Sequence, residues 1–427
     1  MKNTAIFAAA ILLTSFCAIT CRSPQKDLER PEHIVSWRQV TYDSATYAKL
    51  ARLWKDYDDA YPSEEAYGNW MYAARYAKDP EFESLLKKGA DKYPSSPILL
   101  YLLGNQKQTH GAYVEAIQLL ERSAALDPGY MDPWFSLVVA YMSRDDRERT
   151  DVALRRILEG GGVQDEVMDF NYNMIAGLEA NAILITNGDN DTYPGWILTR
   201  IVKFRPDVNI VNRSLLNTEW YPPSVVKDGV PPFITKAGRD SLSAQMETDF
   251  NEAKQKKLPF SSVPLLGDRL VVRIIDAAQR AGRPVYFACT LDDNTLLREL
   301  KSHGRSLGLA TLVTPATKPY EAQCRDLLNT WIRDFRTGGL DSWRVRYEKN
   351  PRSGRMLMHI YAAALSSLRN PISSAGGEVQ LSLFRWYRDH LLVLLPAELA
   401  DQTNAMWCGK SAPREIQDWC KKQGIHR

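Results

Sequence analysis

The pattern of apolar and polar residues divides the chain into three stretches. Across residues 44–165 apolar residues recur every three or four positions, which is the spacing of amphipathic helices. Across 178–316 short continuous apolar runs alternate with helical patterns, as in buried parallel strands joined by helices. From 317 to 427 the helical spacing returns. The pattern therefore predicts a helical domain, a Rossmann-like α/β domain with a parallel sheet, and a C-terminal helical region.

The helical domain contains a repeat. The stretch "ILLYLLGNQKQTHGAYVEAIQLLERSAALDP" (98–128) holds two helical patterns, and Pro94 and Pro128 end successive units 34 residues apart. A period of about 34 residues is that of the tetratricopeptide repeat, a pair of antiparallel helices. The small residues Gly104 and Ala116 permit two such helices to approach closely. We predict three tetratricopeptide-type repeats, of which the flanking two are degenerate.

The α/β domain has four candidate strands, each bounded by turn residues. Helical patterns separate them, and the Pro-, Lys- and Asp-rich stretch 221–262 reads as an insertion that carries one more helix. Strands that alternate with helices at these lengths are expected to run parallel. The candidate strands are "NAILITNG" (181–188), "PDVNIVNRSLL" (206–216), "RPVYFACT" (283–290) and "LATLVTP" (309–315).

The N-terminus has the pattern of an export signal. Lys2 precedes the apolar stretch "AIFAAAILLTSFCAI" (5–19), which is too short for a membrane span. We read 1–20 as a signal peptide and Cys21 as the lipidated residue of a bacterial lipoprotein, with ordinary cleavage near Thr20 as the alternative. The polar residues that follow indicate a tether over 21–43. We therefore expect an exported cell-envelope protein, an outer-membrane lipoprotein that contacts the membrane only through its lipid anchor.

Charge and cysteine content exclude some functions. The 54 basic and 51 acidic residues give a net charge of +3, which argues against nucleic acid as a partner. Cys408 and Cys420 are candidates for a disulfide that closes a short loop, and Cys289 reads as a core thiol. The six histidines are scattered and no CxxC pair occurs, so neither a zinc site nor another cofactor is expected.

Four ordered segments of the α/β domain resemble a known family. "AILITNGDNDTYPGWIL", "RPDVNIVNRSLLNTEWY", "RPVYFACT" and "GLATLVTP", across about 182–315, resemble the soluble C-terminal region of large bacterial multi-pass membrane proteins. The membrane half of that family is similar to protein O-mannosyltransferases, and its members occur widely in Bacteroidota. The resemblance implies the fold and the source, and in some relatives tetratricopeptide repeats adjoin this region. Because glycosyl transfer is expected of the membrane half, no transferase residue carries over to this chain.

A polar loop follows the first candidate strand, where open parallel sheets bind ligands. Its members are Asn187, Gly188, Asp189, Asn190, Asp191 and Thr192. Gly188 permits a close backbone approach or a positive φ. Asp189 and Asp191 offer oxygens for a divalent cation, as in the Asp-x-Asp of many nucleotide-sugar glycosyltransferases. The alternative is capping, with Asp191 or Thr192 as N-cap of a helix whose first turn contains Pro194.

Three residues after the second strand, Asn217, Glu219 and Trp220, are expected to face the same crevice. No nucleophile elbow or Cys/His pairing is present, and the catalytic residues of any reaction are unknown. We therefore expect a non-catalytic scaffold that presents its repeats to a protein or peptide partner. The alternative is a glycan- or nucleotide-sugar-related enzyme or accessory factor that uses the 187–192 loop, with Glu219 as a base.

Overall fold

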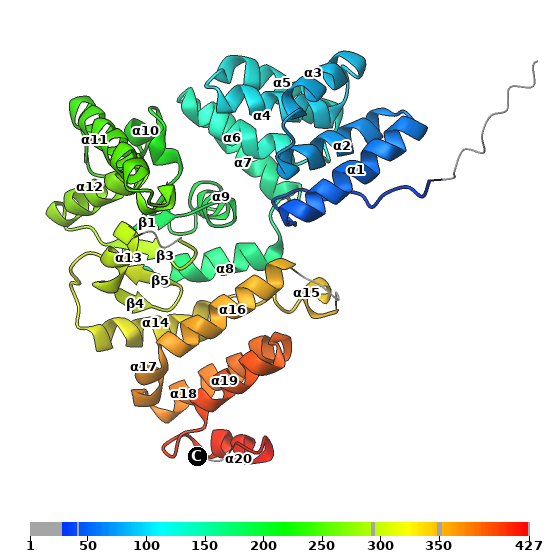
Figure 1. The fold of residues 1–427 in the computed structure, drawn as a ribbon. Coiled ribbons are helices and arrows are strands. Elements are labelled where there is room, and N and C mark those ends of the chain that lie inside the picture. Colours follow the sequence, from blue (N-terminus) through cyan, green and yellow to red (C-terminus); the bar gives the residue numbers. More distant parts are fainter. Residues whose placement is uncertain (1–27, 41, 292–294, 348–351, 426–427) are drawn as a thin grey trace, which may run out of the picture.

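The computed structural model describes residues 28–40, 42–291, 295–347 and 352–425. Figure 1 shows a helical stack in blue and cyan, a sheet with its helices in green and yellow, and C-terminal helices in orange and red. The expected signal peptide and Cys21 lie outside the described residues. Within those residues, no helix combines the length and the apolar character needed to cross a membrane.

Seven helices form the N-terminal stack. Most of them pack on the next helix in the chain, beginning with α1 on α2, which is consistent with the predicted helical domain. A Cβ atom on Gly104 would lie 2.8 Å from Cγ of Leu120, so the close approach of α4 and α5 depends on this glycine. The helices are α1 (Ser44–Ala60), α2 (Glu64–Ala77), α3 (Phe82–Lys92), α4 (Pro97–Thr109), α5 (Tyr113–Leu126), α6 (Asp132–Ser143) and α7 (Arg147–Glu159).

The chain before α1 packs against the stack. Ile34 is 7% exposed, and the ring of Trp37 stacks on Tyr76 of α2 with 5.8 Å between ring centroids. Arg30 also forms an ion pair with Glu65 of α2, so the described part of the stretch expected to be a tether contacts the helical stack. Buried apolar residues such as Ile34 belong to the core of the helical stack.

The sheet has five strands in the order β2-β1-β3-β5-β4. Strand β1 (Ile183–Thr186) lies between β2 (Asn209–Asn212) and β3 (Val285–Ala288), and it is parallel to both. Strand β5 (Ala310–Leu312) runs antiparallel to β3 and to the edge strand β4 (Arg305–Leu307). The prediction of an all-parallel sheet is therefore wrong, because the fourth predicted strand, 309–315, is the antiparallel β5.

A tight turn explains this difference. Helix α13 (Thr295–Ser302) leads from β3 to β4, and β4 runs in the same direction as β3. Leu307 of β4 pairs with Ala310 of β5, so only two residues connect these strands, and Gly308 has a φ of +68°. The hairpin reverses the chain, so that β5 lies between β3 and β4 and pairs with both in the antiparallel direction. The three residues of β4 were too few to be recognised in the sequence.

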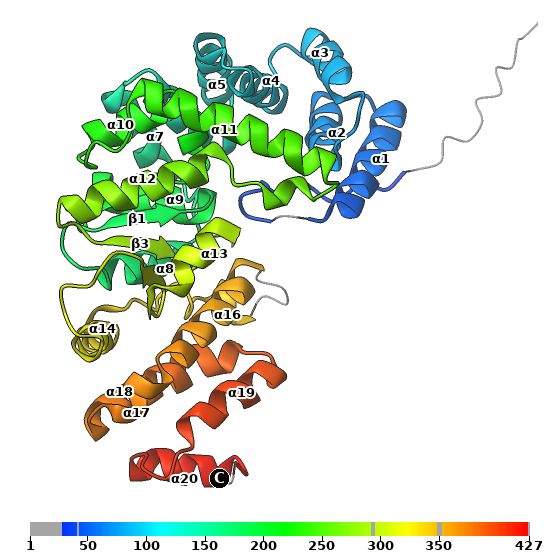
Figure 2. The same cartoon turned by 60° about the vertical axis from the view of Figure 1, so that its left-hand side comes forward.

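Helices flank the sheet, and α8 packs on α9, α14 and α16. Helix α11 lies within the stretch expected to be an insertion, and Figure 2 shows it running alongside α12 and beyond its end. These helices are α8 (Asp165–Ala176), α9 (Asp189–Trp196), which continues into a π-helical turn (Ile197–Ile201), α10 (Tyr221–Lys227), α11 (Lys236–Gln255) and α12 (Leu266–Arg280).

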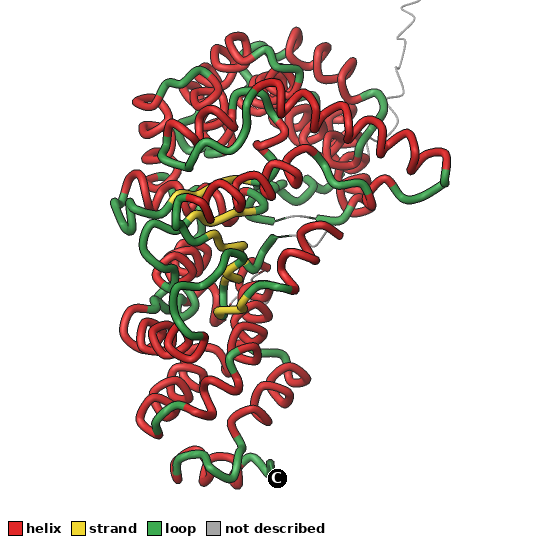
Figure 3. The backbone as a smooth tube through the Cα atoms, turned by 90° about the vertical axis from the view of Figure 1, so that its left-hand side faces the viewer, coloured by secondary structure: helices red, strands yellow, loops and turns green. Residues whose placement is uncertain are grey.

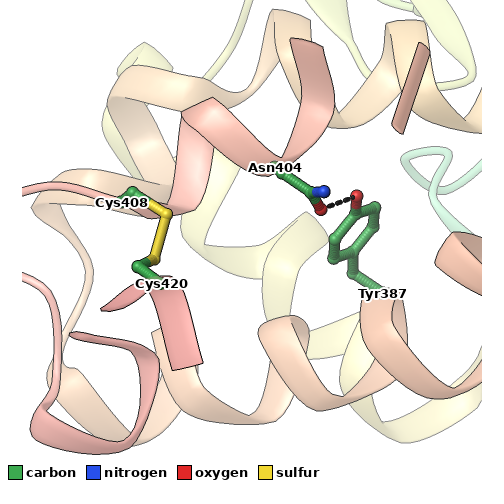
Figure 4. Close-up of a disulfide and its surroundings, with 4 residues drawn as sticks. All are labelled: Tyr387, Asn404, Cys408 and Cys420. Atoms are coloured by element: carbon green, nitrogen blue, oxygen red, sulfur yellow. Dashed lines mark hydrogen bonds between the residues drawn. A yellow bond between two sulfur atoms is a disulfide. The ribbon is translucent and has the colours of Figure 1, made fainter. Parts of the chain in front are cut away.

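The C-terminal region is helical, as predicted. Cys408 and Cys420 form a disulfide between α19 and α20, and the Tyr387 hydroxyl donates a hydrogen bond of 2.7 Å to Asn404 Oδ1 (Figure 4). Cys289, after β3, is half-buried, and burial raises the pKa of its thiol to about 12. The helices are α14 (Tyr320–Asp334), α15 (Trp343–Tyr347), α16 (Arg352–Ser367), α17 (Arg369–Ser374), α18 (Gly377–Trp386), α19 (Ala397–Trp407) and α20 (Arg414–Lys422).

Candidate functional site

The polar 187–192 loop lies at the carboxyl end of β1, as predicted. Helix α9 already begins at Asp189, with Gly188 as its N-cap, so neither Asp191 nor Thr192 is the N-cap and Pro194 lies inside the helix. Gly188 has a φ of −142°, and a Cβ there would meet no atom within 4 Å. This glycine is required neither for a positive φ nor for close packing.

Asp191 joins the ends of β1 and β3. Its carboxylate accepts hydrogen bonds from the backbone N–H groups of Asn187 (2.8 Å) and Gly188 (2.9 Å), and from the Thr290 hydroxyl (2.5 Å). The side chain is buried, which raises the pKa of the carboxyl group, while these hydrogen bonds oppose the rise. The order β2-β1-β3 makes this the place where a ligand is expected to bind. At this place the Asp191 carboxylate is already engaged in hydrogen bonds within the protein.

Thr192 joins β1 to β2. Its hydroxyl lies 2.8 Å from the Thr186 hydroxyl and accepts a 2.8 Å hydrogen bond from the Asn212 side-chain amide. All three side chains are buried. Nearby, Arg213 approaches Asn187 Oδ1 to 3.4 Å and forms an ion pair with buried Asp268. These bonds fasten the carboxyl ends of the two strands to each other.

Asn171 of α8 compensates for the proline inside α9. Pro194 has no N–H to donate to the Asn190 carbonyl four residues earlier. The buried side-chain amide of Asn171 in α8 donates to that carbonyl instead, at 2.8 Å. Asn190 thus holds α8 against α9 through its backbone, while its side chain is exposed.

Asp189 connects the sheet to the helical stack. Its carboxylate oxygen Oδ2 lies 3.0 Å from Nε of Arg38, which precedes α1. The other side of the same guanidinium lies 3.3 Å from Asp132 of α6 and 4.6 Å above the Phe135 ring. The side chain of Asp132 is 1% exposed and that of Arg38 is 11% exposed, whereas that of Asp189 is 32% exposed. Arg38 therefore bridges two carboxylates in different parts of the fold.

A cluster of tyrosines surrounds the buried carboxylate of Asp132. Tyr72 donates to it at 2.9 Å and Tyr130 at 3.4 Å, and the Ser36 hydroxyl also bonds to it. Tyr101 accepts a hydrogen bond from Arg38 at 3.4 Å. We call Arg38, Tyr72, Tyr101, Tyr130 and Asp132 the arginine–tyrosine cluster.

Burial fixes the charge states of this cluster. Burial and the charge of Asp132 raise the pKa values of Tyr72 and Tyr130 well above their usual value, so both phenols stay protonated and donate. Burial lowers the pKa of the Arg38 guanidinium, but attraction to Tyr101, Asp189 and Asp132 outweighs it and raises the pKa well above its usual value. Arg38 is therefore a permanent cation held between carboxylates.

The cluster borders a cavity on the inner face of the stack. The cavity has a volume of about 490 Å³ and is lined by residues 33–36 and 39 together with α2, the start of α4 and α6. Two exposed carboxylates of α2, Glu64 and Glu65, and that of Asp127 before α6 also line it. Its wall is therefore acidic and aromatic.

The three residues expected at the second strand end do not converge on the 187–192 loop. The side chain of Asn217 accepts a 2.9 Å hydrogen bond from the Gly267 N–H at the start of α12. Glu219 is 92% exposed and lies 3.9 Å from Arg239. Trp220 Nε1 donates to the Tyr113 hydroxyl of α5 at 3.1 Å, so this ring also connects the sheet domain to the stack.

No group of three or more His, Cys, Asp or Glu side chains with metal-binding geometry occurs among the described residues. Asp189 and Asp191, the two expected cation ligands, have different partners. Asp189 faces Arg38, and Asp191 faces backbone N–H groups.

The arginine–tyrosine cluster is not predicted by the sequence, because Arg38 lies in the stretch 21–43 that is expected to be a tether. One signal was present: "IVSWRQV" (34–40) is too apolar and aromatic for a solvated linker. Nothing local in the sequence connects Arg38 with Asp132 or Asp189, because those contacts span 94 and 151 positions.

One comparison with known proteins bears on this region. A family model described as TMEM260-associated domain 2 matches residues 167–227. The match fits a TMEM260-like family related to O-mannosyltransferases. It begins within α8 and ends with α10, so it includes β1, the 187–192 loop, β2, and Asn171 with its bond to Asn190. No curated protein matches the chain.

Proposed function

We propose that this protein is a cell-envelope lipoprotein, anchored through Cys21, whose helical stack is a peptide-binding scaffold of the tetratricopeptide type. Its source is a member of the Bacteroidota, and its Rossmann-like sheet domain supports the stack. One observation carries the proposal: the stack holds a chain segment of the protein itself, residues 28–40, which has no regular secondary structure up to Ser36 and then turns over residues 37–39.

The contacts of this segment are those by which a groove recognises a peptide. Trp54 Nε1 donates to the Glu32 carbonyl at 3.2 Å, and the Tyr72 hydroxyl accepts from the Trp37 N–H at 2.9 Å. Bonds to backbone groups contribute affinity for any extended chain, and pockets for side chains contribute specificity. Ile34 fills an apolar position, and Arg38 reaches the Asp132 carboxylate.

The acidic cavity beside this segment indicates the chemistry of a partner. Its exposed carboxylates favour basic residues: Glu65 pairs with Arg30 of the attached segment, as Asp132 pairs with Arg38. The proposed ligand is therefore a peptide that combines an aliphatic residue with an aromatic and a basic residue at a turn, as Ile34, Trp37 and Arg38 do in the attached segment. It competes with residues 28–40 or extends along the cavity beside them.

The contacts of the 187–192 loop favour a scaffold function over a catalytic one. Three of its side chains bond to other elements of the protein: Asp191 to the end of β3, Thr192 to β2 and Asp189 to Arg38, while Asn190 bonds to α8 through its backbone carbonyl. Carboxylates engaged in this way position helices. They are not poised to bind substrate.

A fluorescent peptide of residues 28–40, added to the full chain, tests the peptide groove. The Ile34→Ala/Trp37→Ala substitutions weaken the packing of the protein's own residues 28–40 on the stack. We therefore expect this variant to bind the free peptide at least about tenfold more tightly than the unmodified protein does. Adding Asp132→Asn to this variant removes the carboxylate that pairs with Arg38 of the peptide and is expected to lower the affinity for the peptide about tenfold. The control Glu148→Gln, at an exposed carboxylate of α7, is expected to leave that affinity unchanged. Circular dichroism verifies that each variant is folded. No saturable binding to a folded variant would disprove the groove.

The family match supports one second candidate, a glycan- or nucleotide-sugar-related enzyme or accessory factor. Thermal melting of the purified protein with Mg²⁺, Mn²⁺ and nucleotide sugars separates the two functions. Under the scaffold proposal no compound raises the melting temperature. A rise that Asp189→Ala abolishes would favour the glycan function instead, with the Arg38 ion pair opening to admit the ligand.

A further inference from the structure

The turn that follows α11 carries apolar and basic side chains at a projecting end of the molecule. Leu258 and Phe260 are 50% and 60% exposed. We call residues 254–262 the basic tip, because all its charged residues are lysines: Lys254, Lys256 and Lys257. Figure 3 shows the end of α11 and this turn reaching beyond the neighbouring helices at the right of the view.

The tip is built as a rigid turn. Lys257 has a φ of 53°, which lets the Leu258 N–H bond back to the Ala253 carbonyl at 2.9 Å and ends the helix. Pro259 prevents the helix from continuing, and the Ser262 hydroxyl bonds to the Pro259 carbonyl at 2.6 Å. At such helix ends the apolar residue after the turn usually packs back on the helix. Leu258 instead stays half exposed, so the turn presents it outward.

Phe260 is presented in the same way. Its ring lies 6.0 Å from that of Phe250 on α11, a contact that orients it, yet most of its surface remains exposed. Single exposed apolar residues are common on protein surfaces. Two of them within three residues, directly after three exposed lysines, form a combined apolar and cationic surface.

We propose that the basic tip docks on an anionic phospholipid bilayer, with Leu258 and Phe260 entering the headgroup boundary and the lysines facing lipid phosphates. Two features favour a bilayer over an acidic protein. A convex turn of nine residues makes contact with a plane, whereas a stable protein interface buries about 800 Å² on each partner. Exposed Leu and Phe side chains flanked by lysine are also the composition of interfacial membrane anchors.

This contact is independent of the peptide groove and of the lipid at Cys21. A basic patch adds electrostatic attraction to anionic lipids, which a lipid anchor by itself does not provide. A docked tip would hold the protein in one orientation on the bilayer.

Vesicle flotation tests the proposal with the chain from residue 22 onward, which lacks both the apolar 5–19 stretch and Cys21, so that neither attaches it to the vesicles. Vesicles contain phosphatidylcholine alone or with 30% phosphatidylglycerol, at low and high salt. We expect Lys254→Gln/Lys257→Gln to lower partitioning onto anionic vesicles about tenfold. Lys256 is left in place because it forms an ion pair with Glu252. The charge-matched control Lys87→Gln/Lys88→Gln, at two exposed lysines of α3, leaves partitioning within about twofold.

The apolar contribution has its own test. Leu258→Ser/Phe260→Ser is expected to lower partitioning about as much, while Val114→Ser/Val152→Ser, at exposed positions of the stack, does not. An environment-sensitive dye on Phe260→Cys should brighten on anionic vesicles, and the same dye on Val152→Cys should not. Equal partitioning of tip and control variants overturns the proposal. A lysine effect without a Leu/Phe effect or dye response also overturns it, in favour of an acidic protein partner.

Discussion

Replacing Arg38 with methionine removes the cation that links the helical stack to the sheet domain, while keeping an apolar side chain of similar length. The change leaves the carboxylate of Asp132, which is 1% exposed, without its ion-pair partner. Removing one member of a buried ion pair costs about 3–5 kcal/mol, because the remaining charge stays desolvated. Hydrogen bonds from Tyr72 and Ser36 remain on that carboxylate. We therefore expect a loss of about 3 kcal/mol in the free energy of unfolding.

The two carboxylates should differ in their contributions. Asp189 is 32% exposed, so water solvates it once Arg38 is absent, and Asp189→Asn should cost less than about 1 kcal/mol. Adding Asp132→Asn to Arg38→Met neutralises the buried charge and should restore about 1–2 kcal/mol. This order follows from burial, since both carboxylates lie within 3.3 Å of the guanidinium.

Urea unfolding at pH 7, followed by circular dichroism and tryptophan fluorescence, measures these differences. The chain has several packed parts, so amide hydrogen exchange in α6 and α9 should accompany the unfolding curves. The reasoning fails if the free energy of unfolding of Arg38→Met is within about 1 kcal/mol of that of the unmodified protein. It also fails if Asp189→Asn lowers the free energy of unfolding as much as Arg38→Met does.

Three further predictions concern other parts of the fold. Gly104→Ala should destabilise the protein by about 1 kcal/mol in urea unfolding, because its Cβ would lie 2.8 Å from Leu120 Cγ and outweigh the gain in helix propensity. Asp207→Asn should cost about 1–2 kcal/mol at pH 7, because hydrogen bonding to Arg205 lowers the pKa of the carboxyl to about 2. That contribution is present above pH 4 and disappears as the pH falls toward 2, so unfolding curves of the two proteins should converge there. Cys408→Ser should remove about 2–3 kcal/mol locally, which hydrogen exchange in α19 and α20 should detect.

Each of these predictions can be refuted, and the glycine prediction has a control variant. Gly377→Ala, in α18, places its Cβ 3.8 Å from the nearest atom and should not destabilise. Equal effects of the two glycine substitutions would refute the packing argument. A stability difference for Asp207→Asn that is the same at pH 7 and pH 2.5 would show that the Arg205 ion pair is not its cause. Unchanged exchange in the last two helices would show that the disulfide does not hold them together.

The sequence predicted the elements whose signals are local. The helices of the stack, strands β1, β2 and β3, and the polar turn after β1 all follow from apolar spacing and turn residues within short windows. The start of α9 was misplaced, because a proline usually marks a first turn. Here Asn171 supplies the hydrogen bond that Pro194 lacks, from a helix more than twenty residues earlier.

The sequence by itself determined the periodic helices, the buried strands, and the supply of polar groups in "NGDNDT" at the end of β1. The tertiary structure alone decided which partners those groups have. Asp189 meets Arg38 and Asp191 meets Thr290 only after the chain has folded. The same holds for the antiparallel β5, whose direction depends on the two-residue turn at Gly308. Periodicity records which side of an element is buried, whereas ion pairs and strand direction depend on residues that are distant in the chain.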